Sequence, residues 1–296
     1  MELKRKSAMG DLFPIGLGAM PLSLSGRPSQ QDAVRVISAF IEHGGNFIDT
    51  ADIYALDMTE AGHNERLVHA AVKACGLQHQ VVVATKGGGT RPDGGWSFRG
   101  GGSPRHLREA CEASLKRFER DAHTLYYLHG PDPEVPLEDS WGELARLQEE
   151  GKIQHLGIAN VTLAQAEMAH QMAPLAAIQN RCNPFCKADL NNGLLDFCTE
   201  NKIIYVPYCP MGGWGEHVKL AGSSLFAPLI EQYDASYYTI CLSWLLQKQH
   251  SIIPIPGVHS MSQVVSNLGA ASVYLDEGAI KVIDEIIDCY QPMHID

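Results

Sequence analysis

The sequence has no apolar run that approaches the roughly 18 consecutive residues needed for a membrane helix. It is also poor in positive charge, with 23 Lys and Arg against 34 Asp and Glu and a formal net charge of -11. This balance argues against nucleic acid as a partner, although it is compatible with a local basic pocket for one phosphate. No apolar run follows the basic N-terminus, so a secretory signal is not indicated. We therefore expect a cytoplasmic protein that binds neither nucleic acid nor membranes.

The eight cysteines lack the spacing of a zinc site, a redox motif or a disulfide framework, and only Cys182 and Cys186 are close in sequence. We expect most of them to be small apolar side chains in a reducing compartment. The absence of a His-x-His pair disfavours a metal-dependent hydrolase, so no metal site is predicted. What the chain does have is 45% hydrophobic residues and a mean hydropathy of -0.11, which are typical of a globular protein with a substantial core.

Short apolar segments recur along the chain and predict eight strands, at residues 15–19, 47–49, 81–85, 124–128, 155–158, 177–179, 203–207 and 252–255. The stretches between them have helical spacing. One predicted helix, around residues 29–43, begins with Ser29 as N-cap. Its buried face is formed by Val34, Ile37, Phe40 and Ile41. Another begins at Ser103-Pro104, with a buried stripe of Leu107, Cys111, Leu115 and Phe118.

Strands that alternate with helices predict a parallel sheet with right-handed crossovers. Eight of each match a closed (β/α)8 TIM barrel, an α/β fold. The rival fold, an open doubly wound sheet, usually carries a Gly-x-Gly-x-x-Gly turn that leads from its first strand into a helix. Here the glycines of Ile15-Gly16-Leu17-Gly18 are followed by Pro21, and no helix is predicted before Ser29. We therefore predict one barrel domain over residues 1–296, since no linker divides the chain.

A glycine-rich segment, residues 87–102, directly follows Lys86. It lacks the Gly-Lys-Ser/Thr ending of a phosphate-binding P-loop. One interpretation is a flexible surface excursion. The other is a loop over the active-site mouth that moves as a lid and packs Trp96 and Phe98 on a substrate. An insertion at residues 55–62 adds Met58 as a third substrate-contact candidate.

Three polar residues end three consecutive predicted strands: Asp49, Lys86 and His129. Tyr54 lies five residues beyond Asp49 on the adjoining loop. Each has an ordinary structural explanation on its own, such as a turn cap or a solvated charge. Because parallel barrels place their active sites at the C-terminal ends of strands, the joint occurrence favours a catalytic group.

This set of side chains suits the reduction of a carbonyl group. Hydride addition to a carbonyl produces an alkoxide that needs a proton as it forms. A phenol has an unperturbed pKa of about 10, and a nearby ammonium would lower it. We expect Lys86 to lower the pKa of Tyr54 in this way, with Asp49 holding the ammonium in place. His129 would orient and polarise the carbonyl oxygen with a hydrogen bond.

These motifs make the chain resemble the aldo-keto reductase family over nearly its whole length. Asp49-Thr50-Ala51-Asp52-Ile53-Tyr54 is similar to the family's Asp-Ser/Thr-Ala-x-x-Tyr, and Asn64-Glu65 follows it. Ala84-Thr85-Lys86 is similar to the family's third strand, and Leu128-His129 to its fourth. The resemblance implies that Tyr54 is the general acid of a catalytic tetrad that consists of Asp49, Tyr54, Lys86 and His129.

The resemblance also implies a cofactor across the barrel mouth, with NADP(H) preferred and NAD(H) as the alternative. Asn160 and Gln179 would hydrogen-bond its carboxamide, and Tyr208 would stack on the nicotinamide ring. The helix that follows the capping-box pattern Ser260-x-x-Gln263 would receive the adenosine end. The residues implied in cofactor binding are Met20, Asp49, Asn160, Gln179, Tyr208, Cys209, Pro210, Gly212, Gly257, His259, Gln263 and Asn267.

Two departures from the family pattern bear on the cofactor. Ala159 stands where a serine is usual, which removes one carboxamide hydrogen bond. Residues 257–260 and Gln263 lack the lysine and arginine that many relatives use on the 2′-phosphate of NADP. His259 is the one cationic candidate there, and it is partly neutral at pH 7. A preference for NADPH therefore comes from the family alone, and use of NAD stays open.

The leading functional interpretation is NADPH-dependent reduction of an aldehyde or ketone. The same site could run in reverse and oxidise a sugar hemiacetal or an alcohol with NAD(P)+. A cofactor-binding sensor or accessory subunit is the less favoured third interpretation. The sequence leaves the natural substrate and the oligomeric state open.

Overall fold

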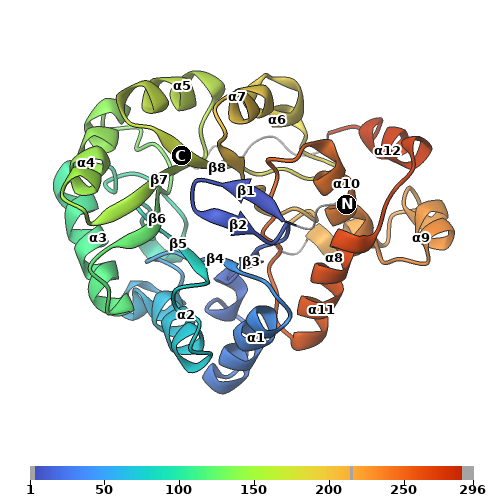
Figure 1. The fold of residues 1–296 in the computed structure, drawn as a ribbon, viewed down its shortest axis with the longest axis horizontal. Coiled ribbons are helices and arrows are strands. Elements are labelled where there is room, and N and C mark those ends of the chain that lie inside the picture. Colours follow the sequence, from blue (N-terminus) through green and yellow to red (C-terminus); the bar gives the residue numbers. More distant parts are fainter. Residues whose placement is uncertain (1–3, 214–215, 289–296) are drawn as a thin grey trace.

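A computed structural model describes residues 4–213 and 216–288. The described residues form a seven-stranded parallel sheet whose strands follow one another in chain order and curl into a ring inside a layer of helices (Figure 1). The strands are β3 (Leu17–Gly18), β4 (Phe47–Asp49), β5 (Val82–Gly87), β6 (His123–Leu128), β7 (Ile153–Ala159), β8 (Leu175–Gln179) and β9 (Ile204–Tyr205). The predicted α/β (β/α)8 barrel is confirmed.

The eighth predicted strand, residues 252–255, closes the ring without forming a regular strand. The carbonyls of Pro254 and Pro256 accept hydrogen bonds of 2.9 and 3.0 Å from Gly16 and Gly18, at the first strand. On the other side, the N–H of Ile253 donates to β9 at 2.9 Å. Proline has no N–H to return to the first strand, so half of the bonds of a regular ladder are missing on that side. The expectation of a full strand here is wrong for this reason.

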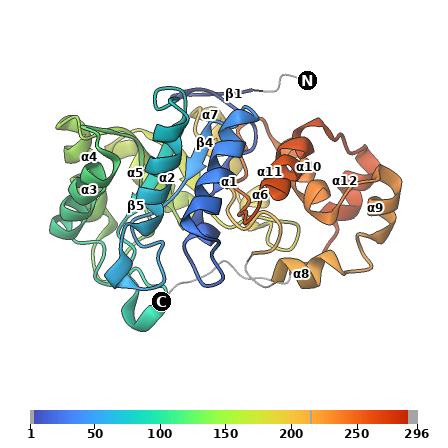
Figure 2. The same ribbon diagram turned by 90° about the horizontal axis from the view of Figure 1, so that it is seen from below.

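The sequence did not predict a short antiparallel hairpin of β1 (Arg5–Ser7) and β2 (Gly10–Leu12). It lies at the centre of the ring in Figure 1 and at one edge of the molecule in Figure 2. Leu12 belongs to the core cluster inside the barrel, together with Phe47 and Val82, the first residues of β4 and β5. The hairpin therefore covers the N-terminal end of the barrel and leaves the opposite end for a site.

Helices pack around the sheet, and their N-caps agree with the sequence. Ser29 accepts a hydrogen bond from the N–H of Asp32, and Ser103 accepts one from His106. The predicted stripe on the second of these helices is buried throughout, whereas Val34 on the first is only half-buried. The described α-helices are α1 (Gln30–Glu42), α2 (His63–Ala74), α3 (Pro104–Phe118), α4 (Leu137–Glu149), α5 (Leu163–Met172), α6 (Ala188–Asn191), α7 (Leu194–Glu200), α8 (Glu216–Ala221), α9 (Ala227–Tyr233), α10 (Tyr237–Lys248), α11 (Met261–Gly269) and α12 (Glu277–Asp284).

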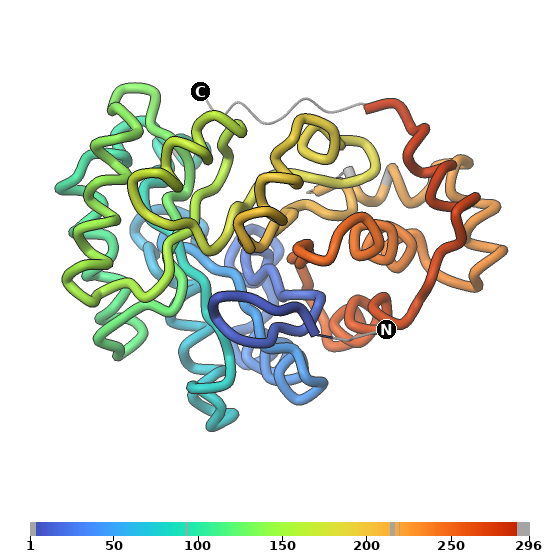
Figure 3. Tube along the Cα trace, turned by 45° about the horizontal axis from the view of Figure 1, so that its top comes forward, coloured from blue at the N-terminus to red at the C-terminus, as the bar shows by residue number. Residues whose placement is uncertain are grey.

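Short 3-10 helices complete the described elements: η1 (Met20–Leu22), η2 (Met58–Glu60), η3 (Pro92–Gly94) and η4 (Ala270–Ser272). The chain can be followed around the ring in Figure 3, with α9 and α12 beyond it on one side. Within the described ranges, no helix is long and apolar enough to cross a membrane. No disulfide joins the seven cysteines of the described residues to one another, and Cys289 lies outside those residues.

Candidate active site

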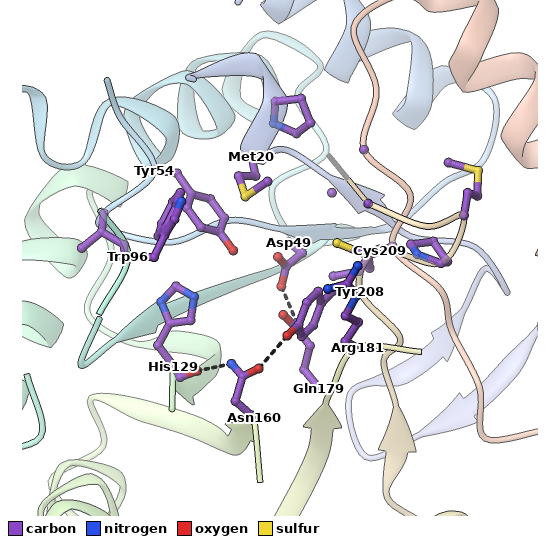
Figure 4. A pocket seen from close by; sticks show the side chains of 18 of the residues that line it. Met20, Asp49, Tyr54, Trp96, His129, Asn160, Gln179, Arg181, Tyr208 and Cys209 are labelled. Atoms are coloured by element: carbon purple, nitrogen blue, oxygen red, sulfur yellow. Dashed lines mark hydrogen bonds between the residues drawn. The ribbon is translucent and has the colours of Figure 1, made fainter. Parts of the chain in front are cut away.

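A cavity of about 590 Å³ opens at the C-terminal ends of the strands. This volume falls within the range of roughly 300–1,000 Å³ typical of small-molecule sites. Asp49, Tyr54 and His129 line it, and Figure 4 shows Asp49 at its centre with Tyr54 and His129 to one side. Lys86 lies directly behind this wall and is completely buried.

Lys86 connects the predicted catalytic residues to one another. Its ammonium Nζ donates hydrogen bonds to Asp49 Oδ1 at 2.6 Å, to the Thr50 carbonyl at 2.9 Å and to the Tyr54 hydroxyl at 3.2 Å. The pairing of β4 with β5 sets this geometry, because it places Asp49 beside Ala84, two residues before Lys86 on the same face of β5. The lysine is thus held in one position by a carboxylate and a carbonyl while it contacts the phenol.

Asn64, in the first turn of α2, makes hydrogen bonds to two segments beside the site. Its side-chain oxygen accepts a hydrogen bond of 2.6 Å from Thr50, and its amide donates to the Ala19 carbonyl at 2.8 Å. Asn64 is fully buried, so both bonds are shielded from water. The first bond ties the loop between Asp49 and Tyr54 to α2, and the second ties the residue after β3 to the same helix.

Aromatic rings lie close to the ring of Tyr54 at the wall of the cavity. The ring of Tyr54 meets His129 and Trp96 edge-on, with centroids 5.8 and 5.9 Å apart. The ring centroids of Phe98 and His129 are 5.8 Å apart. Trp96 and Phe98 reach this position because the glycine-rich segment folds back on itself, with Thr90 and Ser97 paired as an antiparallel bridge. This segment therefore lies along the cavity, and its movement as a lid stays a prediction.

Burial sets the ionisation of the phenol. It raises the pKa of Tyr54 well above its usual value, and the nearby Asp49 charge raises it further. The expectation that Lys86 lowers this pKa is therefore wrong for the site as it stands. The physical reason is first the burial of the phenol, and the positive charge of Lys86, paired with Asp49 at 2.6 Å, does not offset it. Tyr54 is consequently a protonated phenol, the form that a proton donor requires.

Burial also shifts the pKa values of Asp49, Lys86 and His129. Burial raises the pKa of Asp49 and lowers that of Lys86, and the attraction between the two charges opposes both shifts. Burial and the Lys86 charge hold the pKa of His129 well below its usual value, so its ring is neutral. The Nδ1 atom of His129 is buried and has no hydrogen-bond partner among the described residues.

Gln179 and Asn160, which are expected to bind the carboxamide of the cofactor, form hydrogen bonds with other residues of the protein. Gln179 donates from Nε2 to Asp49 Oδ2 at 2.8 Å. Asn160 donates to the His129 carbonyl at 2.8 Å and accepts a hydrogen bond of 2.7 Å from the hydroxyl of Tyr208. These bonds join β8 to β4, and they join the residue after β7 to the segments that follow β6 and β9 (Figure 4).

Most of the predicted cofactor residues line the cavity: Met20, Asp49, Asn160, Gln179, Tyr208, Cys209, Pro210, Gly257 and His259. Three others, all within the described part of the chain, lie outside its lining. Gly212 is in a turn with a φ of 109°. Gln263 turns back to accept a hydrogen bond of 2.7 Å from the N–H of His259, so the capping box is incomplete. Asn267 is buried in the last turn of α11.

Met58 is not brought to the site. It lies on η2, is 46% exposed, and falls outside the cavity lining formed by the described residues. Asp57 caps this short helix by accepting a hydrogen bond from the N–H of Thr59, which turns the segment toward solvent. The expectation that Met58 lies at the site is therefore wrong, whereas Trp96 and Phe98 line the cavity and their contact with a substrate stays a prediction.

The sequence did not identify two basic side chains that line the cavity, Arg181 and His217. Arg181 lies two residues after Gln179, so the period-two alternation of a strand was a signal that could have found it. His217 comes from α8, where no strand or motif marks it. Figure 4 shows Arg181 and Cys209 on the side of the cavity away from Tyr54 and Trp96.

Comparison with known proteins gives consistent results. Residues 14–288 match the model of the aldo/keto reductase family. A probable aldo-keto reductase 1 of Glycine max is 30% identical over 94% of this chain and 86% of its own length. An uncharacterized oxidoreductase of Schizosaccharomyces pombe is 31% identical over 92% of this chain and 85% of its own length.

Solved structures show the same fold. A thermostable aldo-keto reductase in complex with the inhibitor epalrestat has a TM-score of 0.77 and 25% identity, over 95% of this chain and 97% of its own. An aldo/keto reductase from Klebsiella pneumoniae in complex with NADP and acetate has a TM-score of 0.78 and 23% identity, over 96% and 95% of the two chains. On the family match and the curated relatives, this chain belongs to the aldo/keto reductase family, a family of oxidoreductases.

Proposed function

We propose that this protein reduces the carbonyl group of an aldehyde or ketone with NADPH, with Tyr54 as the proton donor. The observation that carries the proposal is the contact between Lys86 and Tyr54, 3.2 Å from Nζ to the hydroxyl, beside the buried pair of Lys86 and Asp49. A protonated phenol at the wall of a mostly apolar cavity is suited to deliver a proton to an oxygen that becomes negative.

The residues present suit a dinucleotide cofactor. The cavity lining includes amide groups and a tyrosine ring, from Gln179, Asn160 and Tyr208, that suit a carboxamide and an aromatic ring. It also includes Arg181, which suits a phosphate group. When bound, a nicotinamide cofactor would supply the hydride to the carbonyl carbon. The NADP and NADPH complexes of two Klebsiella pneumoniae relatives favour NADPH over NADH.

The protein groups then act on the carbonyl oxygen. The Tyr54 hydroxyl donates a hydrogen bond to this oxygen and releases its proton as negative charge develops there. The resulting phenolate is stabilised by the ammonium of Lys86, which Asp49 keeps charged and in place. The neutral ring of His129 donates a second hydrogen bond and fixes the direction of the carbonyl group.

The substrate side of the cavity favours an uncharged, apolar carbonyl compound. Trp96, Phe98, Ile53 and Met20 line it together with the rings of Tyr54 and His129. Aromatic groups pack well against such edges and faces. We therefore expect aromatic or branched aliphatic aldehydes to be better substrates than charged ones.

The test is a panel of aldehydes, ketones, sugars and alcohols, assayed in both directions with NADP(H) and NAD(H). The proposal expects the highest kcat/KM for an apolar aldehyde with NADPH. Faster oxidation of a sugar hemiacetal or an alcohol at matched concentrations would instead support the dehydrogenase alternative. Tight binding of NADPH without turnover of any compound would contradict an enzymatic role and favour a cofactor-binding sensor.

A further inference from the structure

The side chain of Arg91 connects the glycine-rich segment to the loop that carries Tyr54. Arg91 is half-buried. Its Nη1 atom donates a hydrogen bond to the carbonyl of Ala55, the residue after Tyr54. Its Nη2 atom donates to the Gly94 carbonyl at 2.9 Å. The guanidinium group therefore joins two segments that lie 36 residues apart in the chain.

The same guanidinium group lies over the face of Trp96. Its Cζ atom is 4.5 Å from the centre of the indole ring, within the roughly 6 Å at which a cation is attracted to an aromatic face. The indole also meets the ring of Tyr54 edge-on, with centroids 5.9 Å apart (Figure 4). Because Trp96 is 37% exposed, the rest of the protein packs on only part of it. The contact with Arg91 is thus a substantial part of what holds the ring at the cavity.

The backbone on either side of Trp96 is anchored to the barrel, and the tip of the segment is not. At Gly89, a Cβ atom would lie 2.5 Å from a neighbouring side chain, so the chain is packed tightly there. Phe98 is buried, and the bridge between Thr90 and Ser97 joins the two sides. The tip, residues 91–96, extends beyond this bridge. Arg91 ties it to the loop after Tyr54.

Arginine suits this position better than lysine would. The guanidinium group is planar, so one face can stack on a ring while N–H groups in its plane donate to separate carbonyls. A lysine ammonium is a point charge without such a face. Arg91 lies outside the cavity lining formed by the described residues. Its effect on a bound molecule must therefore pass through Trp96.

We infer that Arg91 is a positioning residue that holds Trp96 beside Tyr54 and thereby sets a preference for aromatic carbonyl compounds. This inference rests on the proposed function. An aromatic substrate that packs on the indole gains affinity when the position of that ring is fixed before binding. A small aliphatic aldehyde has no ring to place against the indole, so loss of Arg91 should affect it less.

The kinetics of Arg91→Met test this difference. Methionine keeps an unbranched side chain but lacks the charge, the planar face and both hydrogen bonds. KM for an aromatic aldehyde should rise about threefold to fivefold, the size of one exposed cation–π contact. KM for a small aliphatic aldehyde and the dissociation constant of NADPH should stay nearly unchanged. So should kcat, because the Tyr54 hydroxyl is contacted by Lys86.

Two further variants show whether Arg91 acts through Trp96. In a Trp96→Ala background, Arg91→Met should have no additional effect on KM, since the two residues act through one contact. Arg91→Lys keeps the charge and should still raise KM for the aromatic aldehyde. The matched control is Arg99→Met, in the same segment. Arg99 pairs at 2.7 Å with Glu134, and exposures of 54% and 60% predict little effect.

A second measurement needs no substrate. Acrylamide quenching of Trp96 fluorescence is obtained by subtracting the signal of the matching Trp96→Phe variant. It should increase in Arg91→Met, because one face of the indole loses its cover. It should not change in Arg99→Met.

The outcomes separate the inference from the proposed function. Unchanged quenching in Arg91→Met, an equal rise of KM for both aldehydes, or full retention of KM in Arg91→Lys would each overturn the inference and leave the proposed function unaffected. The same rise of KM with and without Trp96 would also overturn it. If NADPH binds and no carbonyl compound is reduced, the proposed function fails, and the role in specificity fails with it. A selective rise of KM that disappears without Trp96, together with increased quenching, supports the inference.

Discussion

The Nζ atom of Lys86 lies 2.6 Å from Asp49 Oδ1, and the side-chain exposures of the two residues are 0% and 3%. The pair joins the ends of β4 and β5 at the wall of the cavity. In a site of low polarity, a charge whose partner is fixed keeps its position during a reaction. The buried pair of Lys86 and Asp49 therefore fixes the position of the ammonium group beside Tyr54, on which the proposed proton transfer depends.

Replacement of Tyr54 by Phe should reduce kcat at least about a hundredfold, the scale of losing a general acid. The dissociation constant of NADPH should stay nearly unchanged, because the ring that remains still packs against His129 and Trp96. Steady-state kinetics and a cofactor titration measure both quantities. A variant that retained most of its turnover would show that another group delivers the proton.

Replacement of Lys86 by Met should leave Asp49 as a buried, unpaired carboxylate and lower the free energy of unfolding by about 3–5 kcal/mol at pH 8. The raised pKa of Asp49 in the folded protein means that this penalty shrinks as the pH falls toward the unfolded value of about 3.9, because a protonated carboxyl is cheaper to bury.

Denaturant unfolding at pH 5 and pH 8 measures this difference. The double variant with Asp49→Asn provides the control, since it removes both charges and should recover much of the lost stability. A double variant as unstable as Lys86→Met alone would show that the loss comes from altered packing and not from the unpaired charge.

The rate of the reductive step should be nearly constant from about pH 6 to 9. Reduction needs a protonated Tyr54, whose pKa lies well above the usual value, so ionisation of the phenol affects only more alkaline solutions. It also needs a neutral His129, whose pKa lies well below the usual value, so protonation affects only more acidic solutions. Single-turnover reduction across this range is the measurement, and a pronounced change of rate near pH 7 would contradict this assignment.

Substitutions of Trp96 and Met58 provide a matched comparison for the substrate side of the cavity. Trp96→Ala should raise KM for an aromatic aldehyde by about tenfold, because it removes a large ring that packs on Tyr54. Met58→Ala should leave KM unchanged, because Met58 is exposed on η2 and lies outside the cavity lining. Equal effects of the two substitutions would exclude a specific role for the tryptophan.

The sequence predicted those features that depend on position within a strand or helix. Asp49, Lys86 and His129 end consecutive strands, so their meeting at one end of a parallel barrel followed from the alternation of strands and helices. Ser29 and Ser103 began their helices as expected, because capping is a local interaction between a side chain and the backbone three residues on.

Features that depend on contacts across the chain were missed. His217 lies on α8 and lines the cavity, and no local pattern in the sequence indicates this position. The raised pKa of Tyr54 depends on how deeply the phenol is buried and on the close pairing of Lys86 with Asp49, and spacing alone does not reveal either. Met58 was misplaced because its proximity to Tyr54 in sequence does not determine the direction of η2.

Pro254 and Pro256 leave the junction between the first strand and the closing segment with fewer hydrogen bonds than a regular ladder has. Gly18 and Gly257 stand on opposite sides of this junction, and both line the cavity. A ligand that contacts both glycines would stabilise the contact between the first strand and the closing segment. Occupancy of the cavity would then add to the resistance of the whole fold to heat.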